Sequence, residues 1–493
     1  MLKIGWSEKD ITPKKKIGLD GQFYERITGE VESPLAVTAW AVESDGDSMV
    51  ICSCDLLGVG EKLVDMVAQR LRGSGVDPSK VVMGAIHTHT SYVYDIDNRI
   101  SDVSSLDVLK RFLPEDKEYV SLAEDPDVMG KDEATVFLAD RIAECIAEAW
   151  QTRSAGGYAA GFGRAAVGMN RRVCYTDGTA KMWGDTNASD FEALEGGNDS
   201  GIEMLFTYSA DGKLSGVVAN VACPSQVMEH RSVISSDYWG KVRILLREKY
   251  GPDLKVLGLC AAAGDLCPRD LIRWVEPESP INDPNISRET VLPRDADPSM
   301  FDVKGTWVIA RRIVSEIEYA IEEAGAPKTE AILEHQAERL DVPLRCVTTA
   351  EKEAAEAILH NFIEKKNGKF SFEDSAKMHV HAGTIARYEL QKRVTVVPID
   401  VHFIRFGDVA FATNPFELFL DYGNQIRARS KARQTFLIQL ANGDYGYLPT
   451  EKAEKGSHYS AYVSSGFAGH EGGNLLVRET LTRINEMFER EGK

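Results

Sequence analysis

Two histidines that are separated by one residue are the feature of this sequence that most directly suggests chemistry. The segment VVMGAIHTHT, residues 81–90, runs from an apolar, strand-like stretch into His87 and His89. Residues i and i+2 of an extended chain point to the same face, so both imidazoles are expected to project from the carboxyl end of a buried strand. Imidazole is a common metal ligand and the usual acid or base near neutral pH, so the pair indicates a metal site or a proton-transfer pair. Two hydrogen-bonded core histidines would give the same pattern.

The segments around this pair predict strands that alternate with helices. Hairpins are expected to turn at residues 45–47, 211–212 and 406–408, where Asp and Gly supply the turn chemistry. Helical spacing of apolar residues occurs over 61–72, 133–153, 237–250, 306–324, 349–366, 371–393 and 474–490, and a further helix is expected to begin at Glu417. A buried strand that runs into a loop is expected within 255–268, and another strand over 435–442. The stretch around 269–302, rich in Pro, Asp and Asn, predicts a surface excursion that could form a rim or lid.

Neither an internal repeat nor a low-complexity linker interrupts this alternation. We therefore expect one α/β domain over residues 1–493, with a large mixed β-sheet core and surrounding helices. A second pair, His379 and His381, lies within the predicted helix 371–393. Residues two apart on a helix diverge by about 200°, so we do not expect these two imidazoles to share a metal ion.

The composition excludes several classes of protein. Of the 493 residues 43% are hydrophobic, which is enough for a large buried core. A formal net charge of −19 argues against nucleic acid, whose phosphates require a basic face, and against polybasic attachment to anionic lipid. No window approaches the roughly 20 uninterrupted apolar residues of a membrane span. We therefore expect a cytoplasmic protein without a transmembrane segment, whose eight cysteines, none in a CxxC pair, are reduced.

Eight segments, taken in order, resemble the amino-terminal catalytic region of the neutral/alkaline ceramidase family, zinc amidases that cleave the N-acyl bond of ceramide. They are GWSEKDITP at 5–13, CDLLG at 54–58, AIHTHT at 85–90, MNRR at 169–172, ISSD at 234–237, GDLCP at 264–268, NPFE at 414–417 and LANGDYGYLPT at 440–450. The resemblance covers nearly the whole chain and implies the catalytic fold of that family. The chain ends soon after the last predicted helix, so the carboxy-terminal immunoglobulin-like domain of full-length ceramidases is not expected.

Carried over residue by residue, the resemblance implies a zinc site. His87 and Glu417 would be ligands, with Tyr447 as a further ligand through its phenol oxygen. His89 would hydrogen-bond the zinc-bound water or the developing oxyanion, and Arg171 would bind a substrate oxygen. Imidazole, carboxylate and a further oxygen donor leave a tetrahedral Zn2+ with an open position for water, whose pKa falls to about 7 when bound. Hydroxide formed there can attack an amide carbonyl.

The sequence departs from the family at a second zinc-binding histidine. The family has this residue in a segment resembling NxxxHP, whereas the present chain has NVACPSQVMEHRSVISSD at 220–237. Alignment of the proline places Cys223 at the ligand position, and counting from Asn220 places Pro224 there, which cannot ligate. A Cys223 thiolate or His230 could fill the position. Loss of zinc binding is the third possibility.

A second departure concerns a cysteine and the identity of the substrate. Cys267 stands where the family has a serine, and a thiol-dependent acyl transfer would use it as the nucleophile. Thr90, Ser91 and Tyr92 replace an SGP turn of the family. Both changes bear on the substrate, so an N-acyl amide other than ceramide is an open alternative.

Two functions follow from these observations. The first is a zinc-dependent hydrolase of a linear amide, acting on a small-molecule N-acyl substrate in lipid metabolism. The second is a non-catalytic ligand-binding or sensing protein on the same fold, in which loss of the histidine has abolished the metal. The sequence carries no signal for an oligomeric state.

Overall fold

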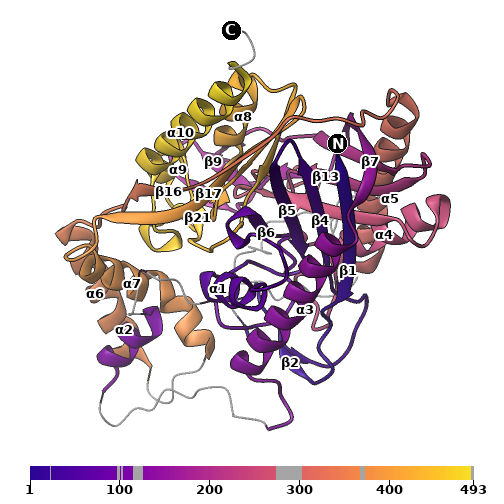
Figure 1. Cartoon of the computed structure of the whole chain (residues 1–493). Helices are drawn as coiled ribbons and strands as arrows, with labels where there is room; N and C mark the ends of the chain where they lie inside the picture. Colours follow the sequence, from indigo (N-terminus) through magenta and orange to yellow (C-terminus); the bar gives the residue numbers. More distant parts are fainter. Residues whose placement is uncertain are drawn as a thin grey trace.

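An eight-stranded mixed sheet forms the centre of the computed structural model, which describes residues 1–22, 24–96, 100, 104–114, 126–273, 302–366 and 372–489 (Figure 1). Its strands lie in the order β14-β13-β12-β7-β1-β4-β5-β6. Only the pairs β5–β6 and β13–β14, at the two edges, are parallel. The bounds are β1 Lys3–Asp10, β4 Ala36–Ser44, β5 Asp47–Cys54, β6 Val81–Ala85, β7 Ser154–Arg164, β12 Gly201–Ser209, β13 Leu214–Val221 and β14 Lys255–Cys260.

A second sheet of four strands packs against the first through apolar side chains. It comprises β16 Leu333–Pro343, β17 Val396–Phe406, β18 Val409–Thr413 and β20 Gln434–Ile438, in that order. Rings from both sheets meet in a shared core, where Trp40 lies edge-on to Phe406 with ring centroids 5.6 Å apart. The amide of Asn220 on β13 also pairs with the backbone of Leu437 on β20, through bonds of 2.8 and 3.0 Å. The two sheets therefore form one continuous interior.

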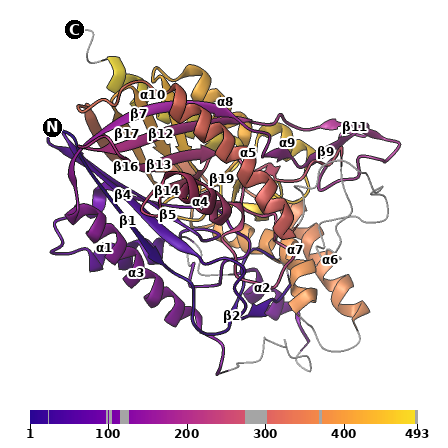
Figure 2. The same cartoon turned by 90° about the vertical axis from the view of Figure 1, so that its right-hand side faces the viewer.

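Helices cover the sheets from several sides (Figures 1 and 2). On one side α3 packs on β1 and β4 and also contacts α1, whereas α4 and α5 pack against each other and α5 covers β7. Helices α8 and α10 lie over the second sheet, and α2, α6 and α7 form a separate group with its own apolar core. The bounds are α1 Glu61–Arg70, α2 Ser105–Phe112, α3 Lys131–Gln151, α4 Asp237–Tyr250, α5 Asp302–Glu323, α6 Thr349–Lys365, α7 Phe372–Leu390, α8 Leu420–Arg429 and α10 His470–Glu489.

Short pairings between loops complete the fold and bring distant motifs together. β8 pairs with β15, which joins the MNRR and GDLCP segments, and β19 pairs with β21, which joins NPFE to the DYGY segment. The remaining short elements are β2 Ile17–Gly18, β3 Ile27–Thr28, β8 Met169–Asn170, β9 Arg172–Tyr175, β10 Ala180–Met182, β11 Phe191–Leu194, β15 Leu266–Cys267, β19 Glu417–Leu418, β21 Tyr447–Leu448, α9 Glu451–Gly456 and two 3-10 turns, Pro78–Lys80 and Val463–Ser465.

The mixed α/β architecture confirms the fold class predicted from the sequence. The predicted hairpins and long helices are present, with ends that differ by a few residues, and α5 and α10 each begin four residues earlier than predicted. The helix predicted to begin at Glu417 is wrong in its start, because Glu417 pairs with Tyr447 in β19–β21 and α8 begins at Leu420. Most of the predicted excursion at 269–302 lies outside the described residues. Within the described part of the chain, no helix is long and apolar enough to cross a membrane.

Candidate active site

The HxH pair lies in the turn that follows β6 and not on an extended strand. β6 ends at Ala85, and His87 has a φ of 59°, a left-handed conformation that is uncommon for residues with a side chain. The strand alternation expected from the sequence is therefore wrong here. The two rings nevertheless converge, with centroids 4.9 Å apart and planes at 83°. Residues in such strained conformations cluster at functional sites.

His87 joins a backbone carbonyl to a carboxylate. Its Nδ1 lies 2.6 Å from the carbonyl oxygen of Leu57, and its Nε2 lies 3.2 Å from Glu417 Oε2. Burial by itself lowers the pKa of His87, but the charge of Glu417 and its hydrogen bond outweigh burial and raise that pKa above its usual value. The contact between the two side chains therefore depends on a positive charge at or beside Nε2.

His89 differs from His87 because its surroundings keep the ring neutral. Its Nδ1 lies 2.8 Å from the carbonyl oxygen of Gly21, which fixes the ring, and its Nε2 is buried without a hydrogen-bond partner. A Cβ at Gly21 would lie 2.8 Å from the His89 ring, so only glycine permits this approach. Burial, followed by the positive charges of His87 and Arg171, lowers the pKa of His89 well below its usual value. A neutral imidazole with an available Nε2 lone pair results.

Glu417 and Tyr447 are neighbours because β19 and β21 run side by side. They are paired directly in this two-residue ladder, and the Glu417 N–H donates to the Gly446 carbonyl at 2.9 Å. Gly264 packs closely against the Glu417 backbone, since a Cβ at that position would lie 2.3 Å from the Glu417 carbonyl oxygen. Burial and the nearby Glu417 charge raise the pKa of Tyr447 well above its usual value, so its phenol stays protonated.

The guanidinium of Arg171 connects Tyr447 and Glu417 to Gln226. One of its terminal nitrogens, Nη2, donates to the Tyr447 hydroxyl at 3.2 Å and to the Gly264 carbonyl at 3.0 Å, and lies 3.9 Å from Glu417 Oε2. The other, Nη1, donates to the side-chain carbonyl of Gln226 at 3.2 Å. The guanidinium is buried, and its Nε has no hydrogen-bond partner. The site therefore presents a fixed cation beside a phenol.

Five further residues surround the site, and the sequence analysis did not identify them. Arg171 and Arg269 both lie over the ring of Trp183, at 5.6 and 4.6 Å from the centroid. Glu229 accepts a hydrogen bond from Gln226 at 2.9 Å, lies 3.6 Å from His89 Nδ1 and forms an ion pair with Arg269. The ring of Tyr459 stands edge-on to Tyr447 at 5.5 Å. Of the five, Gln226 and Glu229 had a signal, because they belong to the segment that departs from the family pattern.

Cys223 and His230 were proposed to replace the missing histidine, and Cys267 was proposed as a nucleophile. Burial raises the pKa of Cys223 well above its usual value, and its thiol donates to the Pro224 carbonyl at 3.4 Å. His230 has both ring nitrogens buried without hydrogen bonds, and burial followed by the charge of Arg269 lowers its pKa to about 4. Burial raises the pKa of Cys267 to about 12, and its thiol bonds with Arg269 backbone atoms at 3.4 Å. The roles of all three stay predictions.

The donor atoms can be compared with the requirements of zinc. A neutral His87 that donates from Nδ1 presents a lone pair at Nε2, and Glu417 Oε2 also presents lone pairs, so a proton or a cation must separate the two atoms. They fit two positions of a metal site. Among the residues that the structure describes, however, no group of three or more His, Cys, Asp and Glu side chains is placed to hold a metal ion. Arg171 also faces both Glu417 and Tyr447. The predicted ligand set is therefore not matched as a whole, and zinc stays a prediction.

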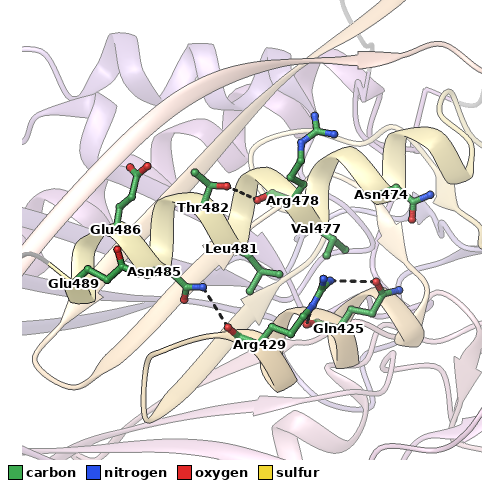
Figure 3. Close-up of a pocket in the computed structure, with 10 residues that line it drawn as sticks. All are labelled: Gln425, Arg429, Asn474, Val477, Arg478, Leu481, Thr482, Asn485, Glu486 and Glu489. Atoms are coloured by element: carbon green, nitrogen blue, oxygen red, sulfur yellow. Dashed lines mark hydrogen bonds between the residues drawn. The ribbon is translucent and has the colours of Figure 1, made fainter.

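A separate cavity of about 590 Å³ lies between α8 and α10 (Figure 3). None of the predicted site residues lines it. Some of its polar groups bond to one another: Arg429 donates to Gln425 at 3.2 Å, and the Asn485 amide donates to the Arg429 carbonyl at 3.3 Å. Because these groups already satisfy each other, the cavity is a weaker candidate than the His87 site.

The fold is similar to that of two solved ceramidase structures. Neutral ceramidase from Pseudomonas aeruginosa matches with a TM-score of 0.65 at 17% sequence identity, over 99% of this chain and 75% of that chain. A ceramidase complexed with C2 matches with a TM-score of 0.65 at 16% identity, with the same coverage. No family model matches the sequence, and neither does any curated protein. The similarity confirms the fold that the eight sequence segments imply.

Proposed function

We propose that this chain, which has the fold of neutral ceramidase, hydrolyses the N-acyl bond of a linear small-molecule amide. The observation that carries the proposal is the convergence of Arg171 and the Tyr447 phenol on one side of the His87–Glu417 pair, with the unpartnered Nε2 of His89 beside it. Hydrolysis of an amide requires hydrogen-bond donors for the oxyanion and a neutral group that can accept a proton from water.

The proposed reaction uses the chain's own residues. The carbonyl oxygen of the amide accepts hydrogen bonds from the Arg171 guanidinium and the Tyr447 hydroxyl, which stabilise the oxyanion of the tetrahedral intermediate. His89 Nε2 takes a proton from the attacking water as the new C–O bond forms. It returns that proton to the amide nitrogen as the C–N bond breaks, so the products are a carboxylic acid and an amine. Glu417 holds His87 in place and balances the positive charges of the site.

The test is an assay of a panel of N-acyl amides with varied acyl length and amine group. Released acid and amine are measured by mass spectrometry for the native chain and for Arg171→Met. Loss of one donor to the oxyanion is expected to lower kcat by about 10² to 10³. Arg427→Met is the matched control, because Arg427 pairs with Asp199 at 2.7 Å and Glu203 at 3.2 Å, neither of which contacts the predicted site residues. Equal losses in both variants would contradict the proposal.

Zinc has its own test, since no step above depends on it. A zinc ion held by His87 and Glu417 would supply Lewis-acid activation of the carbonyl or of water. Elemental analysis of protein purified without chelator, for the native chain and for His87→Ala, Cys223→Ala and His230→Ala, decides the prediction. About one zinc per chain that is lost in His87→Ala supports it, and an absence of zinc from all four proteins refutes it.

A non-catalytic, ligand-binding protein is the second candidate. The observation that favours it is the incomplete donor set among the described residues, in which Cys223, aligned in sequence with the missing histidine, is buried and protonated. This function predicts that His87→Ala keeps the affinity for the ligand. Loss of binding in that variant, or turnover of any amide by the native chain, would exclude it.

A further inference from the structure

Arg172 lies next to Arg171 but contacts a different part of the molecule. Arg171 reaches Tyr447 in the candidate site, whereas Arg172 reaches the segment 457–460, with the sequence SHYS. Adjacent residues at the start of a strand direct their side chains to opposite faces. The two adjacent arginines thus contact two segments that each carry a tyrosine. Arg171 contacts Tyr447, and Arg172 contacts the segment that contains Tyr459.

The segment 457–460 has a strained backbone. Ser457, His458 and Ser460 have φ values of 62°, 73° and 69°, in a region that residues with side chains rarely adopt. Such conformations persist only where the surrounding structure holds them. The conformation turns the Tyr459 ring toward Tyr447, with centroids 5.5 Å apart.

Arg172 donates three side-chain hydrogen bonds to this segment. Its Nη1 donates to the Tyr459 carbonyl at 3.0 Å and the Ser460 hydroxyl at 3.2 Å, and its Nη2 donates to the Ser457 carbonyl at 2.8 Å. Its Nε donates to Glu195 at 2.9 Å, which neutralises the buried charge. The side chain is fully buried. A planar guanidinium makes several such bonds in fixed directions, and a lysine ammonium cannot reproduce them.

We infer that Arg172 is a positioning residue for amide hydrolysis, which holds the strained segment 457–460 so that Tyr459 is fixed against Tyr447 and Arg171. The inference rests on the proposed function and adds a residue to it. Arg172 acts through Tyr459 and does not reach the predicted catalytic groups itself. Arg172 therefore influences how Tyr447 and Arg171 bind the carbonyl oxygen of the substrate.

The test compares Arg172→Lys with Arg427→Lys, a matched replacement of a half-buried, ion-paired arginine away from the site. Hydrogen exchange of the segment 453–462 is measured first, because it does not depend on activity. Arg172→Lys is expected to raise exchange there by about tenfold while exchange in the two sheets stays unchanged. Unchanged exchange in this segment, or an equal rise throughout the sheets, would overturn the inference.

Kinetics on the best N-acyl amide form the second part of the test. Arg172→Lys is expected to lower kcat by about tenfold with KM within about twofold, since a small displacement of a positioned group has such an effect. The double variant with Tyr459→Phe is expected to lose no more than the worse single variant, because both changes act on one element. Additive losses would overturn the inference. If the native chain cleaves no amide, the proposed function fails, and the exchange measurement still decides whether Arg172 orders the segment.

Discussion

Two buried histidines between the sheets make stability sensitive to acid. His335 on β16 donates from Nδ1 to the Ser48 carbonyl, and its Nε2 accepts from Nδ1 of His402 on β17 at 2.8 Å. His402 Nε2 in turn accepts from the Asn442 amide at 2.9 Å. In this series of hydrogen bonds each ring nitrogen is either a donor or an acceptor, so neither histidine can gain a proton without breaking a hydrogen bond. The nearby charged pair Asp47–Lys80 does not supply an acceptor to either ring.

The magnitude follows from the two pKa values. Burial lowers the pKa of His335 to about 4, and burial with the neighbouring His335 lowers that of His402 to about 3. The unfolded chain, with histidine pKa values near 6.5, therefore binds more protons than the folded chain below that pH. The free energy of unfolding falls as pH falls through 6.5, by up to about 1.4 kcal/mol per pH unit for each histidine. At pH 5 the loss is about 2 kcal/mol for each.

Urea unfolding at pH 8, 7, 6 and 5 measures this loss. Because other buried groups titrate in the same range, the informative quantity is the difference between the native chain and the double variant His335→Phe with His402→Phe. That variant is expected to lose less stability between pH 8 and pH 5, by about 4 kcal/mol for the pair. The single change His402→Phe is expected to cost about 1 to 3 kcal/mol at pH 8, since it leaves His335 and Asn442 unsatisfied. Parallel pH profiles for native and double variant would refute the reasoning.

Three further changes test the site and the packing of the sheets. Gly21→Ala places a methyl group against the His89 ring and is expected to lower amide hydrolysis by about 10², while Gly46→Ala, at an open turn, is the control for the positive φ. Activity retained in Gly21→Ala would refute the role of His89. Asn220→Ala is expected to cost about 1 to 3 kcal/mol in urea unfolding, because the Leu437 N–H and carbonyl lose their buried partner. Tyr447→Phe is expected to lower kcat by about tenfold or more with little change in KM, and a raised KM at constant kcat would assign Tyr447 to ground-state binding instead.

The sequence predicted most of what has a repeating or local signal. The long helices and the hairpins follow apolar periodicity and turn residues, and the structure contains them. The helix start at Glu417 was wrong because an acidic residue after Pro415 is typical of a helix start, whereas pairing with Tyr447 delays the helix to Leu420. That pairing is a tertiary contact without a local signal.

The candidate site was predicted only in part for the same reason. The resemblance identified His87, Glu417, Tyr447 and Arg171, which the structure brings together. Trp183 and Tyr459 belong to segments with no motif, and their place beside the site depends on how loops from distant parts of the chain pack. Spacing alone also could not show that Cys223 keeps its proton and donates to Pro224, because burial decides both.

The two-residue ladders β8–β15 and β19–β21 have a consequence for the order of folding. Each contains only two residue pairs, and each joins segments that lie far apart in the sequence. Closing such long loops costs conformational entropy, and two residue pairs offset little of it. These ladders therefore form after the sheets have assembled. The residues of the candidate site therefore come together last during refolding. They also separate first when denaturant is added, so the candidate site is disrupted before the sheets unfold.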